Sequence, residues 1–412
     1  MATIVPTTDD QPSLSVVRFI SELSCADAGP EVAEEQVNRL SMEAVECMMA
    51  GRWLELASLM LTSAELVFSN SKLSEKDLDC IYAVICNLVT KSESVDEAHE
   101  IAKLICSKMI VHSTDKPSLR LKILFNLYNM LENSFSRFYV YMNVLDLALN
   151  GKIPEHVAPS IKKIESFMQE WNLDIKDQRK LFLAVSNVLK ECKSPPNDTF
   201  KFLAKYLATF SGEDANAIAA AKEEAVRTVV EFVKAPDIFQ CDLLEMPVIA
   251  QLETDANHSI VYQLLKIFLT KRLNAYMEFY TANQAELKNY GLVHEDCMTK
   301  MRLLSFVDLA SSDSNQIQYD EIKNTLQIDE EEVEMWVVRA ITAKLVDCKM
   351  DQMNRVVVVS RSLDRVFGEE QWKQLREKLY SWRGNINSVI STIQAGKYHE
   401  DTSQATQGVM TR

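Results

Sequence analysis

The chain has 412 residues, which is enough for two or three domains with a substantial core. It contains only 9 glycines and 10 prolines, which argues against an all-β fold with its many turns. Its formal net charge of −15 argues against a DNA-binding or anionic-membrane protein as a whole. No apolar run approaches the roughly 18 residues of a membrane span, no secretory signal is present, and the cysteines form no CxxC pair, so we expect a cytoplasmic protein.

The first half of the chain shows a regular succession of helical patterns. Residues 1–12 are polar and contain prolines, and we expect them to be disordered. Between residues 13 and 236, candidate pairs of amphipathic helices begin near residues 31, 74, 117, 155 and 197, at intervals of 43, 43, 38 and 42 residues. Because a helix pair cannot bury both of its faces alone, this period predicts an α-solenoid of antiparallel helix pairs. Residues 237–297 continue as helices and form a connector.

Residues 298–361 have the order of a winged helix: helix, short strand, helix, helix, β-hairpin. Ile317 and Tyr319 alternate with glutamines as a brief strand, and Asp320 is placed to cap a short helix that ends at Leu326. A second alternating segment follows from residue 346, and residues 355–359 return as a strand. The fold that we predict is therefore mainly α: a solenoid capped by a winged-helix module with a small β-hairpin, then a long C-terminal helix.

The third helix of the winged module has a complete start signal. Asp329 occupies the N-cap, Glu332 can close a capping box, and Ile328 and Val333 are spaced as a hydrophobic staple. The apolar residues of this helix follow 3.6-residue spacing: Val333, Trp336, Val337, Ala340, Ile341 and Leu345.

The charges of this helix argue against DNA binding, the role for which winged helices are best known. The acids at 329–332 and 334 face only two bases, Arg339 and Lys344. They complement the helix dipole, but an acidic helix tip is repelled by phosphates, so we expect the module to bind protein and not DNA. A weakly basic strip lies further on, and we interpret it as a solvated wing, with a weak RNA contact as the alternative; its residues are Arg339, Lys344, Lys349, Arg355, Arg361 and Arg365.

Two stretches are candidate partner-binding sites. The first is the wing strand, which we expect to be an exposed edge open to strand addition by a neighbour, at Arg355, Val356, Val357, Val358 and Val359. The second is a heptad stripe on the helix predicted at 369–395, here called the seam, and its residues are Trp372, Leu375, Leu379, Trp382, Ile386, Val389 and Ile393. The seam either packs on the chain's own solenoid or joins a bundle with helices of other chains. Gly384 is a weak point of this helix, and residues 396–412 are expected to be disordered.

We find no sequence motif for catalysis, cofactor binding or metal binding. The six histidines lack metal-binding spacing, and phosphate-binding, dinucleotide-binding and serine-hydrolase motifs are absent. We therefore expect no enzyme activity, no cofactor and no metal; a hydrolase whose site is assembled only by the fold is the alternative from another class.

Three segments resemble the PCI-domain family: residues 301–310, 334–341 and 355–362, the last followed by Phe367, Gly368 and Trp372. This family is shared by the proteasome lid, the signalosome and eukaryotic translation initiation factor 3, and the segments are most similar to its subunit M branch in that factor. The resemblance implies a non-catalytic scaffold that binds other PCI and metalloprotease-like subunits by wing-to-wing and helical-bundle contacts. It further implies contact with the 40S ribosomal subunit through the complex, in support of 43S pre-initiation complex assembly and mRNA recruitment. A scaffold of the signalosome or proteasome lid is the alternative.

Overall fold

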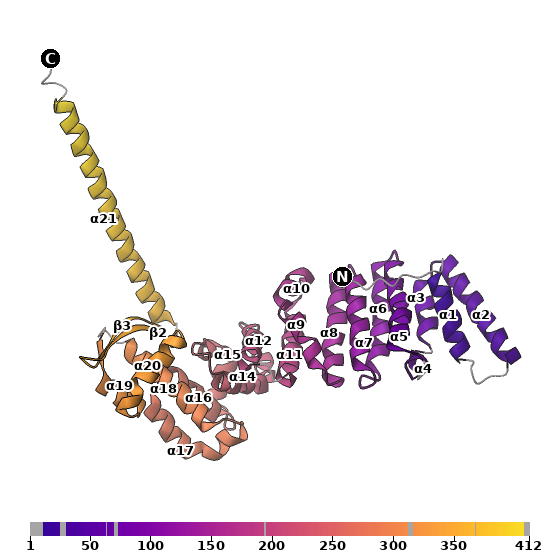
Figure 1. Ribbon diagram of the computed structural model, residues 1–412, viewed down its shortest axis with the longest axis horizontal. Coiled ribbons are helices and arrows are strands. Elements are labelled where there is room, and N and C mark those ends of the chain that lie inside the picture. The colour runs from indigo at the N-terminus through magenta and orange to yellow at the C-terminus, as the bar shows by residue number, and fades with distance from the viewer. Residues whose placement is uncertain are drawn as a thin grey trace. The chain divides into compact units, whose positions relative to one another are not determined.

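The computed structural model describes residues 11–24, 30–62, 64–69, 73–192, 195–311, 316–366 and 368–407. The chain forms two compact units, Met1–Ser211 and Gly212–Arg412. The described residues are mainly helical, with one three-stranded sheet in the second unit and a long C-terminal helix, which confirms the predicted fold class (Figure 1). The division between the units falls before residue 236, where the sequence pattern placed the end of the solenoid.

The first unit is built of helices throughout its described residues. They are α1 (Pro12–Ser24), α2 (Pro30–Met49), α3 (Trp53–Leu61), α4 (Ala64–Ser69), α5 (Glu75–Asn87), η1 (Leu88–Thr90), α6 (Val95–Ile110), α7 (Pro117–Met130), α8 (Ser134–Asn150), η2 (Pro154–His156), α9 (Ala158–Ile161), α10 (Ile164–Trp171), α11 (Ile175–Glu191) and α12 (Pro196–Ala208). Five of these elements begin within one residue of the predicted starts of the helix pairs, at Pro30, Glu75, Pro117, Pro154 and Pro196. Proline suits a helix start because its fixed φ matches the helix and its missing N–H would have no partner there. Helix α1 begins at Pro12, and residues 1–10 lie outside the described residues.

Contacts one repeat apart hold the first unit together. The backbone N of Leu54 donates to Glu97 Oε1 at 3.1 Å, and Lys122 Nζ donates to Asp79 Oδ2 at 2.7 Å. Both pairs are 43 residues apart, which is the interval of the first two predicted repeats. The helices α3, α6, α8 and α11 also pack in this order, each against the next. Equivalent positions of successive helix pairs therefore meet, as stacking of repeats requires.

The second unit begins with a helical part and continues into the winged module. Its elements are α13 (Ala215–Ala220), α14 (Lys222–Lys234), η3 (Leu243–Glu245), α15 (Pro247–Ala250), η4 (Gln251–Glu253), α16 (Ser259–Thr270), α17 (Leu273–Asn289), α18 (His294–Ala310), β1 (Gln316–Gln318), α19 (Tyr319–Leu326), η5 (Glu330–Glu332), α20 (Val333–Thr342), β2 (Val346–Asp351), β3 (Val356–Ser362) and α21 (Glu369–Gln407). From α18 to β3 the order is helix, strand, helix, helix, hairpin, as the sequence pattern predicted.

A buried lysine joins α18 to the end of α14. The side chain of Lys300 is 3% exposed, and its ammonium donates to the carbonyl oxygens of Phe232 and Ala235, the latter at 2.8 Å. These carbonyls lie at the C-terminal end of α14, where backbone oxygens lack helical partners. Burial lowers the pKa of Lys300 to about 7, against smaller opposing effects of Cys241, Cys297 and Asp237. This lysine therefore satisfies a helix end at the cost of desolvating its charge.

The sheet has the order β1-β3-β2, with both pairings antiparallel. Strand β3 is thus the central strand: Val356, Val357 and Val358 have partners in β1 on one side and in β2 on the other. The prediction that residues 355–359 form an open edge is wrong, because the short segment at Gln316–Gln318 pairs with that side of β3. Within the described residues, the outer edge of β2 is unpaired.

The start of α20 also differs from its predicted capping. Asp329 precedes the 3₁₀ turn η5, and neither its side chain nor that of Glu332 makes a capping hydrogen bond. Glu330 instead pairs with Arg355, so the acidic turn is engaged with the residue before β3. Asp320 is likewise not the cap of α19, which begins one residue earlier with Gln318 at its N-cap position. The apolar face of α20 behaves as expected, since Val333, Trp336, Val337 and Ala340 are buried.

Helix α21 begins at the predicted residue, Glu369, and runs to Gln407, beyond the predicted end at residue 395 (Figure 1). Residues 396–407, expected to be disordered, are therefore helical in the structure. Their low apolar content removes a packing surface, but no proline interrupts the helix. Residues 408–412 lie outside the described residues.

Candidate interaction surfaces

The structure leaves the whole seam exposed. All seven seam residues of α21 are exposed, from 38% for Leu375 to 63% for Trp382. Every described side chain between Trp372 and Gln394 is exposed as well, so from Lys373 onward this helix is not buried against the rest of its own unit. The two alternatives for the seam, packing on the chain's own solenoid or joining a bundle with helices of other chains, both stay predictions. A continuous apolar stripe of this length is unusual on the surface of a monomer.

The base of α21 is fixed to the second unit. Arg365, between β3 and α21, is 8% exposed, and its Nη2 donates to the carbonyl oxygen of Phe268 in α16 at 2.6 Å. Gln240 donates to the backbone carbonyl of Asp364 beside it. Burial lowers the pKa of Arg365 to about 10. The chain is therefore anchored to α16 and Gln240 a few residues before α21 begins.

The wing strand is mostly core. Val356, Val357 and Val359 are 8%, 0% and 7% exposed, and only Val358 among the valines shows its side chain, at 36%. Arg355 is exposed with φ of 52° and pairs with Glu330. The uninterrupted valines, which do not alternate with polar residues, are the signal that a central strand would leave.

The basic strip is interrupted in the structure. Arg365 is buried, Arg355 is paired with Glu330, and Arg339 lies over the ring of Trp336 with its Cζ 4.9 Å from the ring centroid. Lys344, Lys349 and Arg361 remain as exposed cations. The six basic residues therefore do not form one continuous surface for a phosphate backbone.

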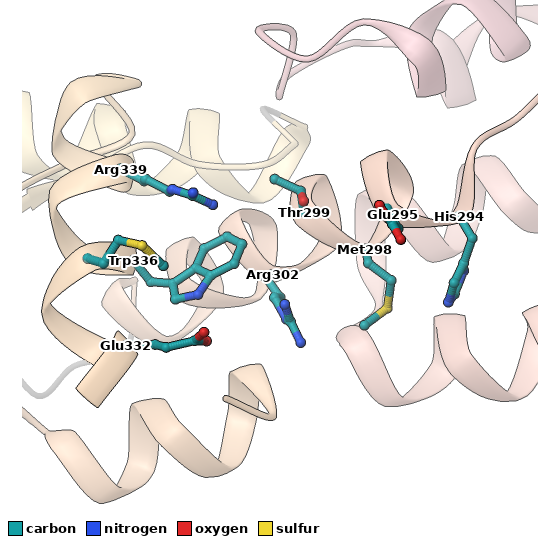
Figure 2. Close-up of a pocket in the computed structure, with 9 residues that line it drawn as sticks. His294, Glu295, Met298, Thr299, Arg302, Glu332, Trp336 and Arg339 are labelled. Atoms are coloured by element: carbon teal, nitrogen blue, oxygen red, sulfur yellow. The ribbon is translucent and has the colours of Figure 1, made fainter. Parts of the chain in front are cut away.

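A groove of about 430 Å³ lies between α18 and α20. Figure 2 shows the ring of Trp336 across it, with Arg339 on one side and Arg302 on the other. The Cζ of Arg302 is 5.3 Å from the ring centroid, and its Nε donates to the carbonyl oxygen of Leu326 at the end of α19. Glu295 and Glu332 balance the two guanidinium charges, so the groove has no strong preference for anions. Its arrangement stabilises the packing of the three helices.

Sequence reasoning missed Arg302, Lys300 and Arg365 as structural residues. All three make side-chain hydrogen bonds to carbonyl oxygens of other elements, 24 to 97 residues away along the chain. The only signal available was a cation within a strongly apolar helical pattern, as at Lys300 in α18.

No group of three His, Cys, Asp or Glu side chains in the described part of the chain is placed to hold a metal ion. No described helix combines the length and apolarity needed to cross a membrane. The described cysteines are free thiols, and burial raises the pKa of the Cys86 thiol to about 12, which makes it a poor nucleophile.

Comparison with known proteins gives a family match for two segments of the second unit. Residues 242–361 match the family model of the PCI domain, and residues 365–393 match a model described as "eIF3 subunit M, C-terminal helix". The second match contains the entire seam.

Relatives that match most of this chain share one name. Eukaryotic translation initiation factor 3 subunit M of Dictyostelium discoideum is 35% identical to this chain, over 83% of this chain and 85% of the relative. The subunits M of Gallus gallus and Homo sapiens are 31% and 30% identical, each over 78% of this chain and 84% of the relative. The chain belongs to the family of eukaryotic translation initiation factor 3 subunit M.

Proposed function

We propose that this chain is a non-catalytic scaffold subunit of eukaryotic translation initiation factor 3, acting in the cytoplasm. In this role it binds other PCI and metalloprotease-like subunits and contacts the 40S ribosomal subunit through the complex. It thereby supports assembly of the 43S pre-initiation complex and recruitment of mRNA. The observation that carries the proposal is the exposed seam, seven large apolar residues along one helix that are 38% to 63% exposed.

The energetics of the seam favour a protein partner. Burying an exposed Leu, Ile or Val side chain is worth about 1.5–3 kcal/mol, and buried aromatic anchors often dominate an interface. Two tryptophans, Trp372 and Trp382, lie on the seam at 60% and 63% exposure. A partner helix that covered them would gain a large apolar contact at little cost in folding, because α21 is already helical.

The wing is a weaker candidate contact after the correction to the sheet order. Val356, Val357 and Val358 already have strand partners on both sides, so a neighbour would meet the outer edge of β2 or the exposed side chains of Arg355 and Val358. We place the main partner contact on the seam for this reason.

The test is a pair of variants on α21. Leu379→Glu with Trp382→Glu puts two charges on the seam and should remove the chain from the initiation factor 3 complex, while circular dichroism and thermal unfolding of the isolated chain stay close to wild type. Ser388→Glu is the matched control, since Ser388 is exposed on the same helix but off the seam, with no charged residue three or four positions away. Recovery of the double variant in the complex at the wild-type level would refute the assignment.

A further inference from the structure

The seam is flanked by positive charge along its first two heptads. With Trp372 at position a, the flanking e positions are Arg376, Arg383 and Ile390, and the flanking g positions are Lys378, Asn385 and Thr392. All six side chains are exposed. The one acid between Trp372 and Ile393 is Glu377, which falls at position f on the side away from the seam.

These cations have no ion-pair partner within the described residues. Arg376 lies over the ring of Tyr380, its Cζ 5.6 Å from the ring centroid, and neither Lys378 nor Arg383 makes an ion pair. By contrast, Lys373, on the outer side of the helix, pairs with Glu369 at 3.1 Å. Among the described side chains of α21, the unpaired positive charges therefore lie at the borders of its apolar face.

Flanking charges of one sign select the partner of a helical seam. When two helices pair along a and d positions, residues at e and g of one approach those of the other. A second copy of α21, paired in parallel and in register, would place Arg376, Lys378 and Arg383 against the same three cations, and like-charge contacts oppose this pairing. A helix with carboxylates at these positions would form ion pairs instead.

The third heptad differs from the first two. Asn385 and Thr392 are uncharged, and Ile390, 46% exposed, adds a third apolar residue next to Val389 and Ile393. The apolar face is therefore wider at this end, as on helices that pack against more than one neighbour.

Building on the proposed function, we infer that the occupant of the seam is a helix of another polypeptide with acidic flanking residues opposite Arg376, Lys378 and Arg383 and an uncharged, apolar surface opposite Ile390. The same charge pattern opposes parallel pairing with a second copy of this chain. The expected partner helix thus has an apolar stripe along its whole length. Acidic residues border this stripe only in the half that faces Arg376, Lys378 and Arg383.

The experiment uses the full-length chain and three synthetic helical peptides. They share the same apolar residues at a and d and carry Glu, Gln or Lys at every e and g position. Titration calorimetry at low salt should give affinities in the order Glu, Gln, Lys, with about an eightfold difference between the Glu and Gln peptides, since each of three exposed ion pairs contributes about twofold. The difference should shrink at 1 M salt, where the screening length is about 3 Å.

Charge variants of the chain sharpen the test. The triple variant Arg376→Glu, Lys378→Glu, Arg383→Glu should reverse the order of the three peptides. The single variant Arg383→Glu should weaken the Glu peptide about threefold, whereas the matched variant Lys373→Glu, the same change away from the seam, should leave its affinity within the error of the measurement.

Two failures have different meanings. If the seam variant Leu379→Glu with Trp382→Glu abolishes binding but all three peptides bind the wild-type chain equally, the charge inference is overturned and the seam as a docking site stands. If that double variant binds the Glu peptide as well as wild type, or no peptide binds, the docking role of the seam falls, and the inference with it.

Discussion

Helices α20 and α21 carry similar apolar stripes, but the stripe of α20 is buried and the stripe of α21 is exposed. Trp336 on α20 is 4% exposed, because α18, α19 and β2 pack around its helix. Trp382 on α21 is 63% exposed. Both stripes follow helical periodicity in the sequence, so periodicity shows that a face is apolar but not what covers it. The comparison separates apolar residues that stabilise the fold of this chain from apolar residues that are available to bind another chain.

The largest expected effect comes from truncating the two tryptophans in parallel. Trp336→Ala should destabilise the chain by about 3–5 kcal/mol, because it opens a cavity among three packed elements. Trp382→Ala should change the free energy of unfolding by less than about 0.5 kcal/mol and instead weaken partner binding by about 2 kcal/mol or more. Urea unfolding of both variants, with affinity measurements on the second, checks this. Equal losses of stability would show that the seam is covered in the free chain.

The two faces of β3 provide a second contrast within one strand. Val357→Ala should cost about 2 kcal/mol, from two lost methyl groups and the cavity they leave, because Val357 is 0% exposed. Val358→Ala, the same change at a side chain 36% exposed, should cost much less. Thermal unfolding of the two variants measures the difference, and a larger loss for Val358→Ala would contradict the assignment of Val357 to the buried face of the sheet.

Lys300 makes the stability of the second unit depend on pH. Its pKa in the folded chain is about 7, below the 10.5 of an ordinary lysine, so above pH 7 the unfolded chain holds a proton that the folded chain has released. Stability therefore rises with pH, by about 2 kcal/mol between pH 7 and 8.5, relative to a Lys300→Met variant that cannot titrate. Urea unfolding of both proteins across this range measures the difference. Parallel pH profiles would refute the lowered pKa.

The smallest expected effect is at Gly384 on the outer side of α21. An added Cβ meets no atom within 4 Å, and alanine favours a helix over glycine by about 1 kcal/mol. Gly384→Ala should therefore raise the helix content and melting temperature of α21 by circular dichroism. Since position 384 lies off the seam, peptide affinity should fall by no more than the error of the titration, and a clear loss would place the partner on this face.

Much of the fold was readable from local patterns, and the failures have a common cause. Helix starts at Pro117 and Pro196 and the order of elements from α18 to β3 depend on residues close in sequence. The central place of β3, the pairing of Glu330 with Arg355 in place of a capping box, and the burial of Arg365 depend on segments far apart in the chain. For the candidate site, the seam residues were identified correctly as a stripe, but their exposure was left open between two alternatives.

Periodicity, charge and helix-starting residues belong to neighbouring amino acids, so the amino-acid sequence alone decided that this chain is a helical array with an apolar stripe and basic borders near its end. Which of its apolar faces are covered depends on surfaces that distant segments bring together, and only the tertiary structure decided that. It buried three valines of β3 and the ring of Trp336 and left the seam exposed, because no other described element of the second unit buries α21 beyond its base.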